Sequence, residues 1–136
     1  MAQIIAGDLL ATASESFELS SAGTFGFDGL PADEKAVMAL RQWSLDLSAH
    51  RCQPVTAQYL RDHDFLVVMD PSHIHAIQAV THDCLEKVVR LWEHTDTPGR
   101  ADEVFDPIGL DTGGFIECRD LIHECLQNWL PKIIGA

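Results

Sequence analysis

Positively charged residues are scarce in this chain of 136 residues, which has 9 Lys and Arg against 21 Asp and Glu and a formal net charge of −12. Sequence-independent binding to nucleic acid or to an anionic membrane needs a basic face. The charge balance therefore disfavours both partners. A small anionic substrate is not excluded, because a cationic pocket can lie within an acidic surface.

Long apolar runs are also lacking, and none approaches the roughly 20 residues of a membrane-spanning helix. Residues 1–13 contain no Lys or Arg, whereas a secretory signal has a basic start. The four cysteines (Cys52, Cys84, Cys118 and Cys125) form no Cys-x2-Cys pair, so structural zinc is not expected. A chain this long has a core and does not need disulfides. We therefore expect a reduced, cytoplasmic protein without metal or cofactor.

The composition is that of a folded chain, with 46 % hydrophobic and 22 % charged residues. At this length we expect one domain, residues 1–136, with a core that buries roughly two-thirds of the unfolded surface.

Hydrophobic periodicity predicts helices that alternate with short strands. Helices are predicted over 1–13, 31–43, 56–60, 73–80 and 115–129, strands over 17–21, 65–69 and 88–92, and a polar loop over 95–101. The run at 65–69 is apolar throughout, which is typical of a central strand in a parallel sheet. The fold class expected is α/β, with a small parallel sheet flanked by helices on both faces. Ligands of such folds bind beyond the carboxyl ends of the strands, at the loops 23–30, 70–73 and around Asp106.

Four motifs stand in a recognisable order along the chain. They are S-S-A-G-T at 20–24 followed by G-x-P-A-D at 29–33, D-L-S-x-H-R at 46–51, D-F-L-V-V-M-D at 64–70, and D-P-I-G at 106–109. In this order they resemble the low-molecular-weight protein tyrosine phosphatases, over nearly the whole chain. The resemblance implies the flavodoxin-like arrangement of that family.

The family's nucleophile loop, C-x5-R-S between the first strand and the first helix, does not occur in these residues. In many members the sequence after that loop reads S-P-M-A-E, and Met1-Ala2-Gln3 falls where M-A-E would fall. We therefore expect that the first strand and the catalytic loop are missing, and that Met1 corresponds to an internal methionine. Residues 1–136 alone are expected to be inactive.

The resemblance implies a protein phosphatase that hydrolyses phosphomonoesters through a phosphocysteine intermediate. Its Cys thiolate attacks phosphorus, its Arg clamps two phosphoryl oxygens, and an Asp protonates the leaving oxygen. Asp106 corresponds to that general acid, although an Asp before Pro is also common in plain turns. Phe27 aligns with an aromatic of the substrate cleft, and a buried staple under its loop is the alternative. Ile108 replaces an aromatic of phosphotyrosine-specific members, so phosphotyrosine and phosphoarginine proteins are both candidate partners.

Other candidate sites are weaker. Cys84 and Arg90 satisfy C-x5-R by count, but no glycine between them lets backbone amides surround a phosphate. His73 and His75 point to different sides of a helix, so solvated histidines are expected rather than a metal site. His50 is expected to hold structure by hydrogen bonding, and the acidic residues Asp96, Asp102, Glu103 and Asp106 to lie in a solvated loop.

Two further functions fit the same scaffold. One is a degenerate phosphatase-like module that binds a phosphoprotein or another partner without cleaving it. The other is a thiol arsenate reductase, which needs additional reactive cysteines near the site. Cys118 and Cys125 lie on the apolar stripe of the last helix, and this argues against the reductase.

Overall fold

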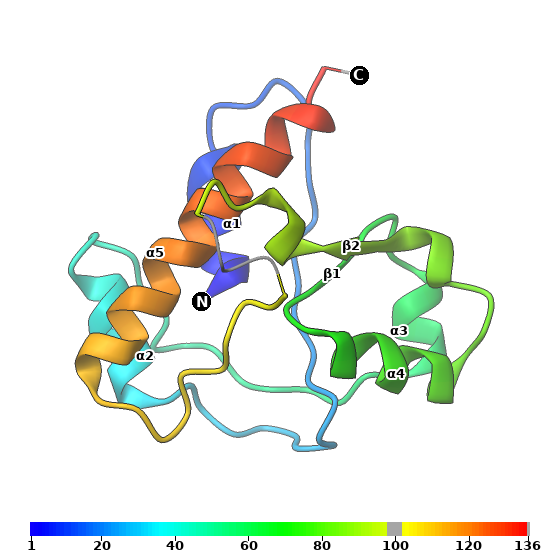
Figure 1. Ribbon diagram of the computed structural model, residues 1–136, viewed down its shortest axis with the longest axis horizontal. Helices are drawn as coiled ribbons and strands as arrows, with labels where there is room; N and C mark the ends of the chain where they lie inside the picture. Colours follow the sequence, from blue (N-terminus) through cyan, green and yellow to red (C-terminus); the bar gives the residue numbers. More distant parts are fainter. Residues whose placement is uncertain (98–101, 136) are drawn as a thin grey trace.

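Five helices and two short strands make up the regular structure in a computed structural model that describes residues 1–97 and 102–135 (Figure 1). The helices are α1 (Ala2–Leu10), α2 (Glu34–Arg41), α3 (Ala57–Arg61), α4 (Pro71–Val80) and α5 (Thr112–Trp129), the strands are β1 (Leu66–Val68) and β2 (Val88–Arg90), and 3-10 turns are η1 (Leu85–Lys87), η2 (Leu91–His94) and η3 (Leu130–Lys132). Part of the polar loop predicted at 95–101, residues 98–101, lies outside the described residues. In Figure 1, α3 and α4 lie beside the strands, whereas α1, α2 and α5 form a second group.

The two strands form a parallel pair, as the sequence predicted. Leu66 is opposite Val88 and Val68 is opposite Arg90, with α4 and η1 in the connection between them. Both strands are shorter than predicted. The chain after β2 winds into η2, which buries Trp92 without a strand.

The strand predicted over 17–21 is wrong, because no strand forms there in the described chain. The carbonyl oxygens of Leu19 and Ser21 accept hydrogen bonds from the side chains of Gln3 and Gln53, at 3.2 and 3.0 Å. Alternating side chains favour an extended backbone, but a strand also needs a neighbouring chain to pair with. Here that pairing is limited to one isolated bridge, between Gly23 and Pro54.

Helix α5 supplies the centre of the core. Its predicted apolar stripe is confirmed, since the buried residues include Phe115, Cys118, Ile122, Cys125, Leu126 and Trp129. The helix packs against α1, α2 and η2, which appear beside it in Figure 1. Its first turn is capped by Asp111, whose carboxylate accepts from the Gly114 N–H at 2.9 Å.

A buried arginine joins α5 to α2. Arg119 is 6 % exposed, and its guanidinium donates to the Ala39 carbonyl at 2.8 Å and to Gln42 Oε1 at 2.7 Å. The same group lies 4.0 Å from the centre of the Trp43 ring and 2.8 Å from Asp120. The buried charge is therefore satisfied by hydrogen bonds, a carboxylate and a cation–π contact.

Side-chain caps set the starts of α2, α3 and α4. Thr56 caps α3, as the sequence predicted, by accepting from the Tyr59 N–H at 3.1 Å. The helix predicted from residue 31 begins only at Glu34, because Asp33 is its cap and Pro31 bridges to Arg51. None of the described helices is long and apolar enough to cross a membrane.

Asp70 ends the apolar run of β1 and caps α4, accepting from the Ser72 N–H at 2.7 Å. Burial alone would raise the pKa of the Asp70 carboxyl. The hydrogen bonds from Ser72 and the nearby His73 outweigh burial, and the pKa lies below its usual value. The carboxylate therefore stabilises the folded state above the unfolded pKa near 3.9, and this stabilisation is lost as the pH falls through the lower folded pKa.

We predict that Asp70→Ala lowers the free energy of unfolding by about 1 kcal/mol at pH 7, because a helix cap is removed. The difference from the unsubstituted protein should shrink as the pH falls through the folded pKa of Asp70. Urea denaturation over a pH series measures both. Asp8→Ala, on the exposed side of α1, is the control, and an Asp70→Ala deficit that persists undiminished at the lowest pH would contradict the assignment.

Candidate active site

Asp106 lies on an exposed loop whose backbone is shaped by local hydrogen bonds. Its carboxylate accepts from the Ile108 N–H at 3.0 Å, and the Leu110 N–H donates to the Pro107 carbonyl at 2.9 Å. Gly109 has a φ of 85°, which L side chains rarely adopt and which suits the third position of this turn. The D-P-I-G motif therefore forms a tight turn that presents the Asp106 carboxylate to solvent.

Three elements attach this loop to the rest of the molecule. The Val104 N–H donates to the carbonyl of Met69, just after β1, at 2.6 Å. The Cys118 thiol on α5 donates to the Phe105 carbonyl at 3.3 Å, and Lys35 Nζ on α2 donates to the Leu110 carbonyl at 2.7 Å. Asp106 is thus held between contacts from β1, α5 and α2.

Sequence reasoning missed two of these anchors. It placed Cys118 in the core, where it lies, but the apolar stripe contained no signal for a hydrogen bond to Phe105. It predicted no role for Lys35, because no sequence motif links this helical lysine to the Asp106 loop, which is far from it along the chain. Both anchors arise from tertiary packing of α2 and α5 against the loop.

The electrostatic surroundings of the buried Cys118 thiol include groups from the Asp106 loop and from the start of α1. Burial raises the pKa of the Cys118 thiol to about 12. The carboxylates of Asp106 and Glu117 act in the same direction, whereas the Met1 amino group opposes them. Burial in turn lowers the pKa of the Met1 amino group. The Asp106 carboxylate and the Met1 amino group therefore act on the Cys118 thiol in opposite directions.

The D-L-S-x-H-R motif forms a turn near that end of α1. Asp46 accepts from the N–H and the hydroxyl of Ser48, at 2.8 and 2.6 Å, and Arg51 donates to the His50 carbonyl at 2.7 Å. His50 makes its hydrogen bonds through its backbone, since its N–H donates to the Leu47 carbonyl at 3.1 Å, whereas its ring makes none to the described residues. Burial, the Met1 amino group and Arg51 lower the pKa of His50.

Phe27 lies in an exposed loop between two isolated bridges, Gly23 to Pro54 and Pro31 to Arg51. The Phe27 side chain is 60 % exposed, so the alternative of a buried staple is wrong. Its use as a wall of a substrate cleft stays a prediction. Ile108 is also an exposed apolar side chain, at 66 %.

The cysteines of the chain do not form a phosphate-binding loop. Cys84 is only 1 % exposed and directly precedes η1, which leads into β2, so Arg90 lies at the end of a strand. Cys118 and Cys125 are buried, and burial raises the pKa of Cys125 to about 11. Cys52 accepts a hydrogen bond from the Leu30 N–H at 3.3 Å and is partly accessible.

The histidines of α4 do not share one environment. His75 is exposed, as expected, but His73 is half-buried, and its Nδ1 accepts from the Met69 N–H at 3.1 Å. The prediction of a simply solvated His73 is therefore wrong. No cluster of His, Cys, Asp and Glu suited to a metal ion occurs among residues 1–97 and 102–135.

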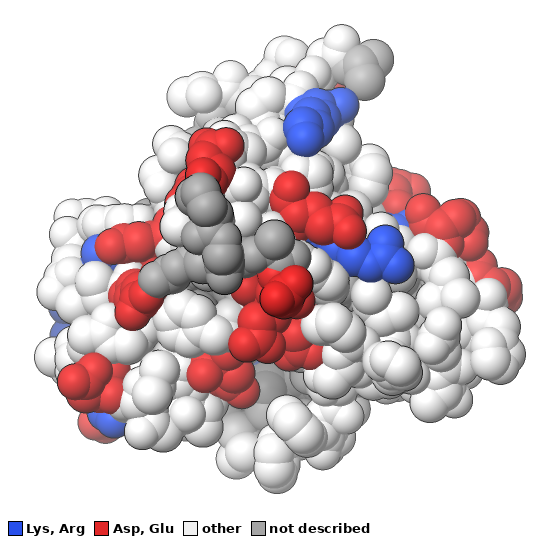
Figure 2. Space-filling view, viewed as in Figure 1, with Lys and Arg blue, Asp and Glu red and all other residues white. Residues whose placement is uncertain are grey.

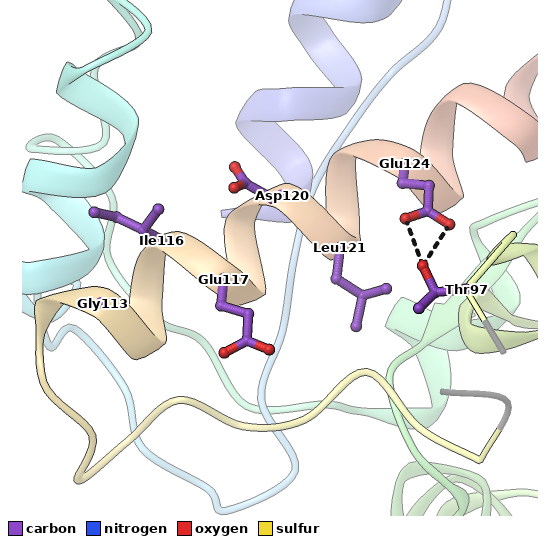
Figure 3. A pocket seen from close by; sticks show the side chains of 7 residues that line it. All are labelled: Thr97, Gly113, Ile116, Glu117, Asp120, Leu121 and Glu124. Carbon is purple, nitrogen blue, oxygen red and sulfur yellow. Dashed lines mark hydrogen bonds between the residues drawn. The ribbon is translucent and has the colours of Figure 1, made fainter. Parts of the chain in front are cut away.

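A cavity of about 370 Å³ opens elsewhere, along α5 (Figure 3). Its lining includes the carboxylates of Glu117, Asp120 and Glu124, and Glu124 is hydrogen-bonded to Thr97. Carboxylates are also spread over this face of the molecule, with few Lys and Arg (Figure 2). Such a cavity repels a phosphate ester, so we do not assign the substrate to it.

Comparison with known proteins identifies the family. The family described as "Low molecular weight phosphotyrosine protein phosphatase" matches residues 1–135. The chain belongs to this family. The probable low molecular weight protein-tyrosine-phosphatase EpsP of Ralstonia nicotianae is 28 % identical over 125 residues, which are 92 % of this chain and 83 % of that protein. The phosphatase Ptp of Acinetobacter johnsonii is 29 % identical over 117 residues, 85 % of this chain and 78 % of Ptp.

Solved structures show the same fold. The tyrosine phosphatase AmsI of Erwinia amylovora superposes with a TM-score of 0.86 at 21 % identity, covering 99 % of this chain and 83 % of AmsI. The tyrosine phosphatase Wzb of Escherichia coli K30, in complex with sulphate, superposes with a TM-score of 0.85 at 24 % identity, covering 97 % of this chain and 87 % of Wzb. These structures confirm the α/β fold expected from the sequence. The relationship to hydrolases rests on the family match and on the similarity to protein-tyrosine-phosphatases such as Ptp.

The burial of the cysteines predicts their reactivity. With iodoacetamide at pH 8, Cys52 of the folded protein should be alkylated first, whereas Cys84, Cys118 and Cys125 should react at least ten times more slowly, because they are buried. Mass spectrometry of tryptic peptides measures each site. Reaction in urea is the control, in which all four should react alike. Fast modification of Cys84 in the folded protein would contradict this prediction. It would make the C-x5-R sequence from Cys84 to Arg90 a candidate phosphate-binding motif again.

Proposed function

We propose that this chain carries the scaffold and the general acid of a phosphatase that removes phosphate from proteins. The observation that supports the proposal is the attachment of the Asp106 loop to α5, where Cys118 donates to the Phe105 carbonyl at 3.3 Å, because the same helix packs against α1. A helix N-terminus is suited to bind a phosphoryl group, because its free N–H groups and its dipole favour negative charge. A carboxyl group close to that position can then protonate the leaving oxygen.

Residues 1–136 supply only part of the groups that this reaction needs. The Asp106 carboxyl donates a proton to the leaving oxygen as the phosphorus–oxygen bond breaks, and its carboxylate then accepts a proton from the water that attacks the phosphocysteine. The nucleophilic thiolate and the arginine clamp require a Cys-x5-Arg-Ser sequence, and residues 1–136 contain none. We therefore propose that these residues by themselves do not turn over substrate.

The proposed substrate is a phosphorylated protein that carries phosphotyrosine or phosphoarginine. Phe27, whose side chain is exposed, is the residue proposed to contact it. We place the activity in the cytoplasm, because the four free cysteines fit a reducing compartment. Competition between phosphotyrosine and phosphoarginine peptides for binding to this chain shows which of the two it prefers.

Residues 1–136 are predicted to hydrolyse p-nitrophenyl phosphate no faster than buffer does, because they lack a nucleophile and a clamp. The measurement is release of p-nitrophenolate with purified chain and with its Cys84→Ser variant. Turnover that is lost in Cys84→Ser would refute this prediction. Binding of a phosphotyrosine peptide without turnover would favour a module that recognises phosphoproteins without cleaving them.

The role of Asp106 is tested in the same chain preceded by a strand and a Cys-x5-Arg-Ser loop. Asp106→Asn should lower kcat on phenyl phosphate by a factor on the order of 10²–10⁴, because phenolate leaves poorly without a proton. Dinitrophenyl phosphate should lose much less, since its leaving group is stable as an anion. Asp102→Asn, an exposed neighbour on the same loop, is the matched control. Equal losses on both substrates would contradict the general-acid role.

A further inference from the structure

Three polar side chains that the proposed phosphatase reaction does not use meet at the end of α3. The Ser20 hydroxyl oxygen lies 2.8 Å from Nε2 of His63 and 2.7 Å from the hydroxyl oxygen of Tyr59. Nδ1 of His63 lies 2.6 Å from the backbone carbonyl oxygen of Tyr59. A serine from one part of the chain and a tyrosine and a histidine from another therefore form one hydrogen-bond network.

The backbone carbonyl of Tyr59 sets the direction of each hydrogen bond in this network. A carbonyl oxygen can only accept, so Nδ1 of the neutral His63 ring carries the proton and donates it. Nε2 of the same ring then has a free lone pair, which accepts from the Ser20 hydroxyl. Because the single hydroxyl proton of Ser20 is used in this way, the Tyr59 hydroxyl donates to Ser20 Oγ. The serine oxygen therefore faces a histidine base in the tautomer that can take its proton.

Local structure holds the two sides of the network in place. His63 follows the last turn of α3 by two residues, and its ring lies 4.4 Å from the Tyr59 ring, centre to centre. On the other side, the carbonyl next to Ser20, that of Ser21, accepts from Nε2 of Gln53 at 3.0 Å. Ser20 is exposed, whereas Tyr59 and His63 are half-buried. A reagent in solution can therefore reach the serine while packing orients the base.

Two features distinguish this network from a serine that is held only for structure. First, a hydroxyl, a base and a group that orients the base lie within hydrogen-bond reach of one another, which is the arrangement that activates a serine nucleophile. The orienting group here is a backbone carbonyl in place of a carboxylate. Second, the Tyr59 hydroxyl is a donor beside Ser20 Oγ, where the carbonyl oxygen of an attacked substrate would become negative.

We propose that Ser20 is the nucleophile of an acyl-transfer site for carboxylic esters that carry no anionic group. Its oxygen adds to the ester carbonyl carbon while its proton moves to Nε2 of His63. The bond from that carbon to the alcohol oxygen breaks, and the leaving alcohol takes the proton from His63, so that an acyl group remains on Ser20. Water then attacks the acyl carbon with His63 as the base, which releases the acid and restores the serine.

The charge of the chain and the separate chemistry define the scope of this proposal. Anionic esters are disfavoured because the chain has a net charge of −12. The site uses no cysteine, no arginine clamp and no Asp106. Its success or failure is therefore independent of the proposed phosphatase function.

The first test follows hydrolysis of p-nitrophenyl acetate by the full chain. The rate should exceed that of free imidazole at the same concentration by a factor on the order of 10². Ser20→Ala and His63→Ala should each remove most of this excess, and added imidazole should restore part of the rate in His63→Ala. The matched controls Ser16→Ala and His82→Ala replace an exposed serine and an exposed histidine, and both should leave the rate unchanged.

A second test separates a nucleophile from a structural serine and needs no variant that might fail to fold. A fluorophosphonate probe forms a stable bond from serine oxygen to phosphorus as fluoride leaves. Tandem mass spectrometry of the tryptic peptide 1–35 should place this label on Ser20 of the folded chain and not on the other serines, and unfolding in urea should abolish it. A rate no greater than that of imidazole, an undiminished rate in Ser20→Ala, or labelling that spares Ser20 would each overturn the proposal.

Discussion

The burial of one face of α5 is the interaction on which the rest of the structure depends. Its stripe contacts α1, α2 and η2, so one helix supplies the surface that positions three other elements. Each fully buried aliphatic or aromatic side chain on it contributes roughly 1.5–3 kcal/mol relative to an exposed one. The pairing of β1 with β2 is small by comparison, since each strand has only three residues. The helices, rather than the sheet, therefore hold this chain together.

The same helix connects the core to the candidate site. Cys118 lies in the buried stripe and also donates to the Phe105 carbonyl, next to Asp106. A buried thiol with a raised pKa remains protonated and keeps that hydrogen available at neutral pH. The position of the Asp106 loop therefore depends on the packing of α5. A second contact comes from Lys35 of α2, which donates to the Leu110 carbonyl.

The sequence predicted the elements whose signal is local and left out the features that depend on packing. The stripe of α5, the cap at Thr56 and the apolar run of β1 are each encoded within a few neighbouring residues, and all were recovered. The strand expected at 17–21 failed because pairing depends on a distant chain segment. His73 was misjudged because its partner, the Met69 N–H, becomes available only where β1 ends. Asp106 was proposed as the general acid through an ordered family motif, since its local sequence alone indicates only a turn.

The buried Arg119 shows the same limit of prediction from the sequence. Nothing in the spacing around Arg119 separates it from a solvated helix residue, because its partners Ala39 and Gln42 are about eighty positions away in sequence. Its charge is tolerated in the core only because the α2 carbonyl, an amide and the Trp43 ring surround it. Sequence periodicity reports which face of a helix is buried, but not which polar group on that face is satisfied.

The acidic surface and the candidate site differ in the sign of the electrostatic potential that they need. A phosphate ester is repelled by the carboxylates spread over the face in Figure 2, and a site for it needs local positive potential. The amino-terminal end of a helix supplies such potential, and α1 packs against α5, which contacts the Asp106 loop through Cys118.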